Sequence, residues 1–166
     1  MMLLITTPMP KENKKNYLGI DPGLATTGWG VVTKKKNELI AVDWGIIKTE
    51  KQTPFPERLV QIAEDIKKLI KEYQPEQAAV EELFFCNNAK TAFLVGQARG
   101  VILMELTRKK IKIIELTPLQ VKQSITGYGK ADKAQVQQMV KTVLKLKNIP
   151  RPDDAADALA LAIAAS

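Results

Sequence analysis

Four acidic residues stand where a carboxylate is costly to bury, and their spacing could bring them together. Asp21 ends the apolar run 17–20, and Glu81 lies inside the apolar segment 78–85. Asp154 and Asp157 are three residues apart in an alanine-rich stretch, so on a helix they share one face. Alanines let such a helix pack close to a sheet. A carboxylate taken out of water needs a cation or several donors, and these positions therefore predict a metal site.

The chemistry of such a site is restricted by the absence of histidine from the chain. Imidazole zinc sites and Ser-His-Asp triads are excluded. Clustered carboxylates suit hard, oxygen-preferring Mg²⁺ or Mn²⁺. Two such ions about 4 Å apart activate water and stabilise the leaving oxygen of a phosphodiester.

Two neighbouring acids are expected to lie outside the cluster. Glu81 and Glu82 are adjacent on a predicted strand and point to opposite faces, so at most one of them lies beside Asp21. Asp153 lies about 100° round the final helix from Asp154 and is better placed as its cap.

Each acid also has a simpler interpretation. Asp21 begins the turn Asp-Pro-Gly and could close it with its own side chain. Gly23, Gly28 and Gly30 would allow a loop around a nucleotide phosphate. The aspartates at 153–157 could only favour the helix dipole, with Glu81 facing solvent. Taken together, however, the acids on two apolar strands and one alanine-rich helix favour the cluster.

The charge distribution points to a polyanionic partner. The net charge is +7, and the segment 108–147 holds ten basic and two acidic residues, a local net charge of +8. The rest of the chain is slightly acidic. A solvated helix face could have this composition, but the asymmetry favours phosphate binding.

Length and composition indicate one globular domain. The chain has 166 residues, of which 45% are hydrophobic, and no apolar run approaches the roughly 20 residues that span a bilayer. Its single cysteine excludes an internal disulfide and fits a reducing compartment, so we expect a cytoplasmic protein. We expect residues 1–16 to form a disordered basic lead-in and 17–166 the domain.

Periodicity and turn signals predict a mixed α/β order. Strands are expected at 17–20, 28–33, 38–49, 78–85 and 111–116, and helices at 57–73, 87–110, 118–125, 131–147 and 153–165. Asn88 is a candidate N-cap, and Thr117 caps a helix with Pro118 at its first position. This order fits a five-stranded sheet flanked by helices.

The helix at 87–110 carries small residues at four-residue spacing, Ala92, Gly96 and Gly100. This stripe lets another element approach closely. With Phe93, Val101, Leu103 and Leu106 beside it, the stripe predicts a two-fold dimer interface. The alternative is that the stripe packs on the chain's own sheet.

Six motifs resemble those of one nuclease family, in the family's order. They are GIDPG, TGWGV, VEELFF, GQARG, VKQSITGYGKADKAQV and DDAADALALA, and they extend from Tyr17 to Ala165. Together they are similar to the motifs of RuvC, the crossover junction endodeoxyribonucleases. The resemblance implies a ribonuclease H-like fold, with three antiparallel strands followed by two parallel ones.

The same resemblance implies an activity and partners. These are Mg²⁺-dependent resolution of four-way (Holliday) DNA junctions by paired symmetric nicks, in recombination and repair. It also implies two Mg²⁺ per site, with Mn²⁺ as a substitute, a homodimer, and work with the RuvA–RuvB branch-migration complex.

Residue by residue, the family's four acids match Asp21, Glu81, Asp154 and Asp157. Phe84 matches an aromatic residue that stacks near the junction's unpaired bases, and Phe85 is expected to assist it. Lys122 and Lys133 match basic residues that approach the DNA backbone and the active site.

Three other functions remain as alternatives. They are a ribonuclease H-like nuclease acting on simpler substrates, a catalytically silent nucleic-acid-binding module, and an actin-like nucleotide-binding domain. The four acids count against the silent module, because such a module has no reason to keep mutually repelling carboxylates. The length of the chain counts against the paired domains of actin-like proteins.

Overall fold

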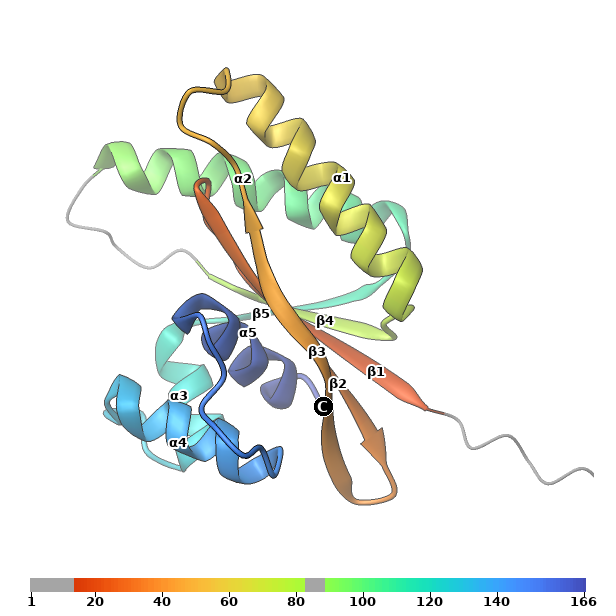
Figure 1. The fold of residues 1–166 in the computed structure, drawn as a ribbon, viewed down its shortest axis with the longest axis vertical. Helices are drawn as coiled ribbons and strands as arrows, with labels where there is room; N and C mark the ends of the chain where they lie inside the picture. Colours follow the sequence, from red (N-terminus) through yellow and green to blue (C-terminus); the bar gives the residue numbers. More distant parts are fainter. Residues whose placement is uncertain (1–13, 83–88) are drawn as a thin grey trace, which may run out of the picture.

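A twisted five-stranded sheet forms the centre of the molecule (Figure 1). The computed structural model describes residues 14–82 and 89–166. Its strands are β1 (Lys15–Asp21), β2 (Thr26–Lys35), β3 (Glu38–Lys48), β4 (Gln77–Glu81) and β5 (Lys112–Leu116). Across the sheet the order is β3-β2-β1-β4-β5. The first three strands form an antiparallel meander, and β4 and β5 add in parallel, as predicted.

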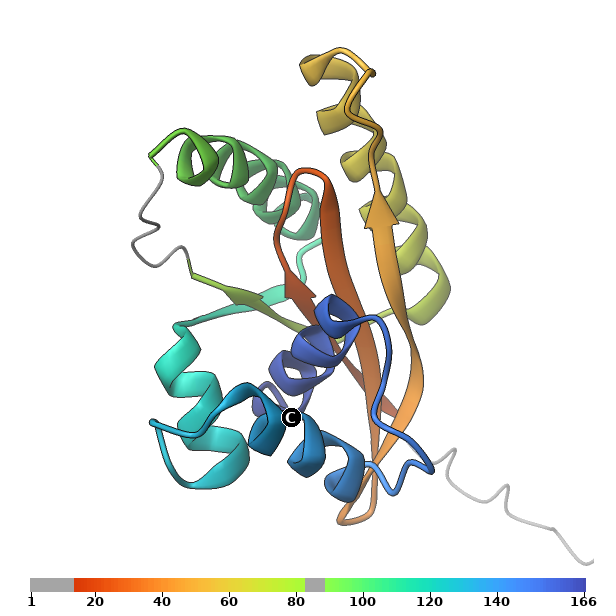
Figure 2. The same ribbon diagram turned by 60° about the vertical axis from the view of Figure 1, so that its left-hand side comes forward.

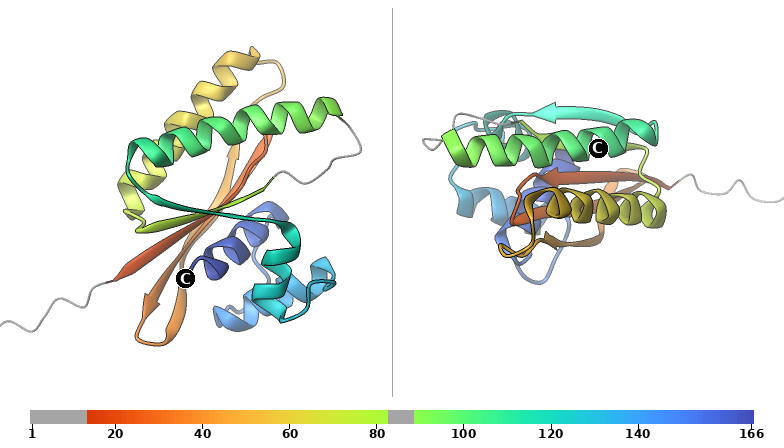
Figure 3. Two further views of the ribbon diagram at one scale, coloured as in Figure 1. Left: turned by 180° about the vertical axis from the view of Figure 1, so that it is seen from behind. Right: turned by 90° about the horizontal axis from the view of Figure 1, so that it is seen from above.

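Helices cover both faces of the sheet (Figure 2). They are α1 (Phe55–Tyr73), α2 (Ala89–Arg108), α3 (Pro118–Thr126), α4 (Lys133–Val143) and α5 (Asp153–Ala164). The pair α1 and α2 packs on one face over residues such as Leu18, Ile20 and Val80. The helices α3, α4 and α5 pack on the other, over Tyr17 and Ala79 (Figure 3). The alternation of side chains along each strand thus divides the core into two layers.

Glycines in β1 and β2 let α5 lie directly against the sheet. Gly19 pairs with Gly30, and Gly28 pairs with Asp21. A Cβ on Gly19 would lie 1.9 Å from the carbonyl oxygen of Ala158, and one on Gly28 would lie 2.1 Å from that of Asp154. Both distances are far inside van der Waals contact. Only glycine permits this approach, and it fixes where the first turn of α5 sits on the strands.

Several boundaries differ from the sequence prediction for local reasons. β1 begins at Lys15, because Lys15 and Asn16 still pair with β2. β4 ends at Glu81, and only the amide of Glu82 continues the ladder by donating to Leu116. The predicted strand at 78–85 is therefore too long within the described residues.

The predicted helix at 131–147 was too long at both ends. Asp132 caps α4, in a capping box with Gln135, so the helix starts only at Lys133. Lys145 adopts a left-handed conformation with φ of 52°, which ends the helix near Leu144. In contrast, α3 begins with the predicted Thr117 cap, reinforced by a capping box with Gln120.

The cap predicted for the last helix was also wrong. Pro152 occupies the N-cap position, and Asp153 is the first helical residue. The side chain of Asp153 instead forms ion pairs with Lys133 and Arg151. The two nearby cations compete with the helix amides for this carboxylate.

No helix in the described part of the chain is both long and apolar enough to cross a membrane.

The glycine contact predicts a large difference between two substitutions. Gly19→Ala places a methyl group inside the backbone of α5, and we expect a loss of about 3 kcal/mol or more in the free energy of unfolding. Gly100→Ala is the matched control, because a Cβ there meets nothing within 4 Å. We expect the control to lie within about 1 kcal/mol of wild type. Denaturant unfolding measures both, and equal effects would show that the glycine contact does not set the position of α5.

Candidate active site

The strand register puts Asp21 beside Glu81. Ile20 pairs with Val80 where β1 and β4 run in parallel, and both acids come one residue later. They lie on the face that α5 covers, because Gly19 and Ala79, two residues before them, face α5. The two side chains lie close enough for each to influence the pKa of the other. Glu81, rather than Glu82, is thus the partner of Asp21.

Helix α5 adds the other two acids from above the strands. The carbonyl oxygen of Asp154 lies against Gly28, which is the strand partner of Asp21. Asp157 is one turn further along the helix, and its charge acts on both Asp21 and Glu81. The structure therefore brings together the four predicted acids from three separate elements.

Burial and mutual repulsion make negative charge unfavourable in this cluster. Burial, followed by the charges of Glu81, Asp157 and Asp154, raises the pKa of Asp21 from 3.8 to about 8. Burial and the charge of Asp157 also raise the pKa of Glu81. Burial raises the pKa of Asp157 as well, although the ammonium group of Lys133 opposes this shift. A perturbed group of this kind in a cleft is typical of a functional site.

Lys133 is the cation closest to the cluster. Its Nζ lies 3.1 Å from Oδ2 of Asp157 and 3.6 Å from Oδ2 of Asp153. Burial works against the charge of Lys133, but the ion pair with Asp157 prevails and raises the pKa of the lysine. Lys133 and Lys122 line a cavity of about 230 Å³ together with Glu81 and Asp157. The predicted lysines and two of the predicted acids thus share one cavity.

The turn after Asp21 is closed by a different residue. The hydroxyl of Thr27 donates to the carbonyl oxygen of Gly23 at 2.6 Å and accepts from its amide at 3.3 Å. A Cβ on Gly23 would lie 2.0 Å from the carbonyl oxygen of Thr26, so this glycine serves the turn itself. Gly28 and Gly30 serve the contact with α5. These roles support neither the Asp21 cap nor the phosphate-loop interpretation.

Arg99 is a positioning residue that the sequence prediction missed. From α2 its Nε donates to the carbonyl oxygen of Glu81 at 2.9 Å, and its guanidinium pairs with Glu115 of β5. Its side chain is only 15% exposed. Arg99 thereby fixes the end of β4, where Glu81 must point toward Asp21. The only signal in the sequence was an arginine within the motif GQARG.

The donor set fits a divalent cation. All four acids offer oxygen ligands, which Mg²⁺ and Mn²⁺ prefer, and a cation would remove the repulsion that raises the pKa values. In 14–82 and 89–166, however, no three acidic or cysteine side chains converge closely enough to hold an ion. The carboxylates would have to close around it. The ammonium group of Lys133, 3.1 Å from Oδ2 of Asp157, offsets part of the negative charge of the acids.

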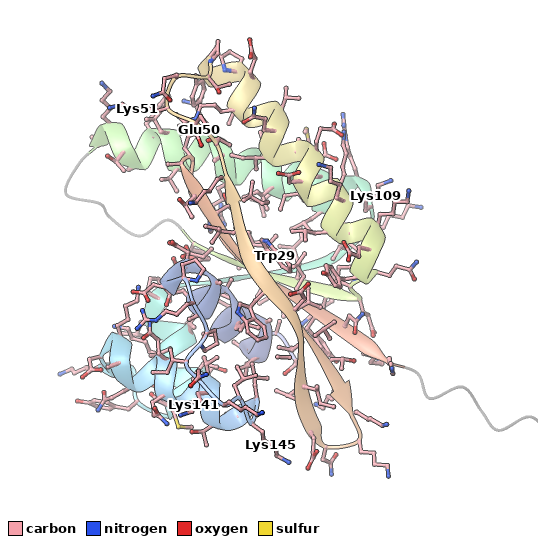
Figure 4. The ribbon with its side chains drawn as sticks, in the orientation of Figure 1. Trp29, Glu50, Lys51, Lys109, Lys141 and Lys145 are labelled. Atoms are coloured by element: carbon pink, nitrogen blue, oxygen red, sulfur yellow. The ribbon has the colours of Figure 1, made fainter. Side chains whose placement is uncertain are left out.

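The basic segment 108–147 does not form one surface. Lys109 lies at the end of α2, whereas Lys141 and Lys145 belong to α4 and the residues after it, on the other side of the sheet (Figure 4). Lys145 is also paired with Glu38 at 2.8 Å. The part of the segment that borders the acids is the part that contains Lys122 and Lys133.

The two predicted stacking residues, Phe84 and Phe85, and the candidate cap Asn88 lie outside the described residues.

Comparison with known proteins identifies relatives along nearly the whole chain. The family model described as crossover junction endodeoxyribonuclease RuvC matches residues 17–165. A protein of that name from Desulfitobacterium hafniense is 54% identical over 146 residues, which is 88% of either chain.

Solved structures give the same result. The structure of Thermus thermophilus RuvC in complex with a Holliday junction superposes with a TM-score of 0.85 at 36% identity, covering 90% of this chain and 92% of that one. The yeast mitochondrial Holliday junction resolvase Ydc2 superposes with a TM-score of 0.60 at 16% identity, covering 90% and 78%. The second likeness concerns the fold alone.

The raised pKa of Asp21 predicts how metal-free protein responds to pH. The folded chain binds the proton of Asp21 more tightly than the unfolded chain does, so stability falls as pH rises from about 4 to about 8. In EDTA, wild type should melt several degrees lower at about pH 8.5 than Asp21→Asn, and this deficit should shrink near pH 5. Mg²⁺ at high pH should raise the melting temperature of wild type more than that of the variant.

Calorimetry at the two pH values measures these differences. A wild type whose melting temperature exceeds that of Asp21→Asn in EDTA at high pH would contradict the repulsion in the cluster.

Proposed function

The chain belongs to the RuvC family of crossover junction endodeoxyribonucleases, and we propose that it resolves four-way DNA junctions. In this proposal it cuts two strands symmetrically by metal-dependent phosphodiester hydrolysis, in recombination and repair. The observation that carries the proposal is the meeting of Asp21, Glu81, Asp154 and Asp157 beneath α5. The junction-bound relative from Thermus thermophilus, which shares the fold at 36% identity, supports four-way DNA as the substrate.

The four acids would hold the metal, which we propose to be two Mg²⁺ with Mn²⁺ as a substitute. When bound, the ions supply an activated water and charge stabilisation for the leaving oxygen. Asp21 and Glu81 are fixed by strand register, so they would form the rigid part of the site. Asp154 and Asp157 come from α5 and close it. Arg99 keeps the end of β4 in place through the carbonyl oxygen of Glu81.

Lys133 has a separate task in this proposal. Its ammonium group pairs with Asp157 at 3.1 Å. With a cation held by Asp157, the same ammonium group would be placed to bind a phosphate oxygen of the DNA. Lys122 lies in the same cavity and would bind the neighbouring phosphate. Phe84, assisted by Phe85, stays our prediction for the residue that stacks on unpaired bases, on the strength of the motif VEELFF.

A silent binding module would be hard to reconcile with the energetics of the cluster. Burial and neighbouring carboxylates raise the pKa of Asp21, so keeping this group charged in the cluster destabilises the fold. Binding to DNA phosphates gains nothing from this negative charge. A nuclease that acts on simpler substrates is separated from a resolvase by the experiment below.

Removal of single acids tests the proposal directly. Asp21→Asn, Glu81→Gln and Asp154→Asn should each lower the cleavage rate of a synthetic four-way junction in Mg²⁺ by at least 10³-fold, a loss like that of other groups essential to a site. Asp157→Asn should follow, with a smaller loss. Junction binding should persist, because these acids do not contact phosphates without a metal.

Glu82→Gln is the matched control and should retain activity. Glu82 directly follows Glu81, and adjacent side chains of an extended segment point in opposite directions. Strand mapping should show paired nicks in the junction, with little cleavage of duplex or RNA–DNA hybrid. Full Mg²⁺-dependent cleavage by Asp21→Asn would refute the assignment of the site. Equal cleavage of all three substrates would leave a nuclease that is not a resolvase.

Paired cuts need two active sites, so we propose a homodimer built on α2. Its outward face carries Phe93, Gly100 and Met104 at spacings of seven and four residues. Phe93 is 71% exposed and Met104 43% exposed, and nothing in the described structure lies within 4 Å of a Cβ on Gly100. The stripe therefore does not pack on the chain's own sheet at Gly100. A two-fold axis would pair this face with itself.

Of the residues expected beside that interface, Leu106 belongs to the core of the chain itself. Leu106 is completely buried in the core beneath α1 and α2, and Val101 and Leu103 pack against the same core. The inward face of α2 is defined by Ala98, Ile102 and Leu106. The helix is apolar on two faces, and the sequence pattern alone did not separate them.

By family membership, we extend the proposed partners to the RuvA–RuvB complex.

The dimer makes a prediction that can be checked by sedimentation. Wild type at micromolar concentration should have about twice the mass of one 18.4 kDa chain. Phe93→Glu should sediment as a monomer with an unchanged melting profile, because the residue is exposed on the chain itself. Val60→Glu, at an equally exposed apolar position of α1, is the control and should remain dimeric. A wild-type monomer that makes paired cuts would exclude the proposal.

A further inference from the structure

A second cavity adjoins the cavity of the active site. It has a volume of about 230 Å³ and is lined by Thr117, Pro118, Leu119, Lys122 and Gly129. Pro118 and Lys122 also line the cavity that contains Glu81 and Asp157. The two cavities are therefore neighbours along the N-terminal half of α3. A DNA strand with one phosphate in the active site would extend from one cavity into the other.

Two large exposed side chains belong to the second cavity or to the residue next to its lining. Leu119 is 61% exposed, and Tyr128, the residue before Gly129, is 58% exposed. A single exposed apolar residue is ordinary on a protein surface. Here, however, an aliphatic residue lines the second cavity, and an aromatic residue directly precedes Gly129, which lines the same cavity.

The loop that carries Tyr128 is held firmly although its side chain is unpacked. The hydroxyl of Thr126 donates to the carbonyl oxygen of Tyr128 at 2.9 Å and accepts from its amide at 3.1 Å. The amide of Ala131 donates to the same carbonyl oxygen at 3.1 Å. Gly127, with φ of 72°, ends α3 in the left-handed conformation that turns the chain. The backbone of Tyr128 is thus held in place beside the second cavity.

The loop also packs tightly on α3. A Cβ on Gly129 would lie 3.2 Å from Oε1 of Gln123 and 3.3 Å from Cγ of Leu119. Leu119 is consequently supported from the loop side while most of its surface remains in solvent. Such support prepares an apolar wall before any ligand arrives, which lowers the entropic cost of binding.

Charge identifies the ligand that fits these walls. The cations nearest in the chain are Lys122, which lines both cavities, Lys130, which is exposed two residues after Tyr128, and Lys133 at the active site. Aromatic and aliphatic surfaces interleaved with cations are the pattern of single-strand nucleic-acid binding, in which bases stack and phosphates pair with lysines. A cavity that continues into a site for phosphodiester cleavage fits a nucleic-acid strand better than a partner protein.

We propose that this second cavity is a subsite for a nucleobase of the cleaved strand, immediately beside the scissile phosphate. Tyr128 and Leu119 contact the base, and Lys122 binds the phosphate between the two cavities. This subsite rests on the proposed function and gives it a substrate-reading element on the α3–α4 loop. It is separate from the predicted stacking residue Phe84, which belongs to another part of the chain.

The test is a cycle in which the ring and the base are removed separately and together. Tyr128→Ser should lower kcat/KM on an intact synthetic junction about tenfold, the size of one base–aromatic contact. Two further junctions each lack one base, the first on one side of the mapped cleavage point and the second on the other. On one of these two junctions, the kcat/KM of wild type should fall by about the same factor, and that of Tyr128→Ser should fall no further.

Control variants separate stacking from other effects. Tyr128→Phe should behave as wild type, because it keeps the ring, and Val60→Ser should have no effect on any junction. Leu119→Gln is an independent variant in the lining of the second cavity. Its kcat/KM should respond to the removal of the base in the same way as that of Tyr128→Ser. Lys122→Ala should flatten the salt dependence of junction binding by about one counterion, unlike Tyr128→Ser and unlike Lys68→Ala, a lysine that is 75% exposed on α1.

The outcomes distinguish this proposal from the one on which it rests. If wild type cleaves the intact junction but Tyr128→Ser and Leu119→Gln cleave it equally well, the subsite is refuted and the resolvase proposal stands. The subsite is likewise refuted if their losses persist on both junctions that lack a base. A wild type that cleaves no four-way junction refutes both.

Discussion

The close contact between α5 and the glycines of β1 and β2 is the constraint on which the rest of the structure depends. It sets the first turn of the helix against the strand position opposite Asp21. Any larger residue at Gly19 or Gly28 would occupy the backbone of α5. The distance between the strand acids and the helix acids is therefore fixed by backbone contact, which is more rigid than contact between flexible side chains.

This constraint has an electrostatic consequence. Once α5 is seated, four carboxylates share a partly buried space, and the folded state must neutralise some of their charge. The ammonium group of Lys133, which pairs with Asp157, offsets part of it. The arrangement is stable enough to fold but remains receptive to cations. A site of this kind links metal binding to folding stability, because the same charges govern both.

The two helical layers divide the work of the molecule. On one side of the sheet, α1 and α2 build an apolar core, present an exposed face with Phe93 and Gly100, and supply Arg99 to the end of β4. On the other side, α5 carries Asp154 and Asp157, and α3 and α4 carry Lys122 and Lys133 with the loop of Tyr128 between them. Arg99 connects the two, since it reaches from the core-building layer to the strand end that bears Glu81. The proposed substrate contacts and the proposed dimer contacts thus lie in different layers of the structure.

The sequence by itself indicated the five strands and five helices, the four candidate acids and the family, because periodicity, caps and motif order are local properties. Tertiary structure decided which neighbours these residues have. Asp153 pairs with Lys133 and Arg151 although its position indicated a cap, since the lysine comes from another helix. Leu106 faces the core although its spacing fitted an interface, because α2 is apolar on two faces. The basic segment divides between two sides of the sheet, and Arg99 acquires its role only where β4 and α2 meet. The sequence gives the charge and polarity of each side chain, but the contacts of that side chain are fixed only when the helices pack on the sheet.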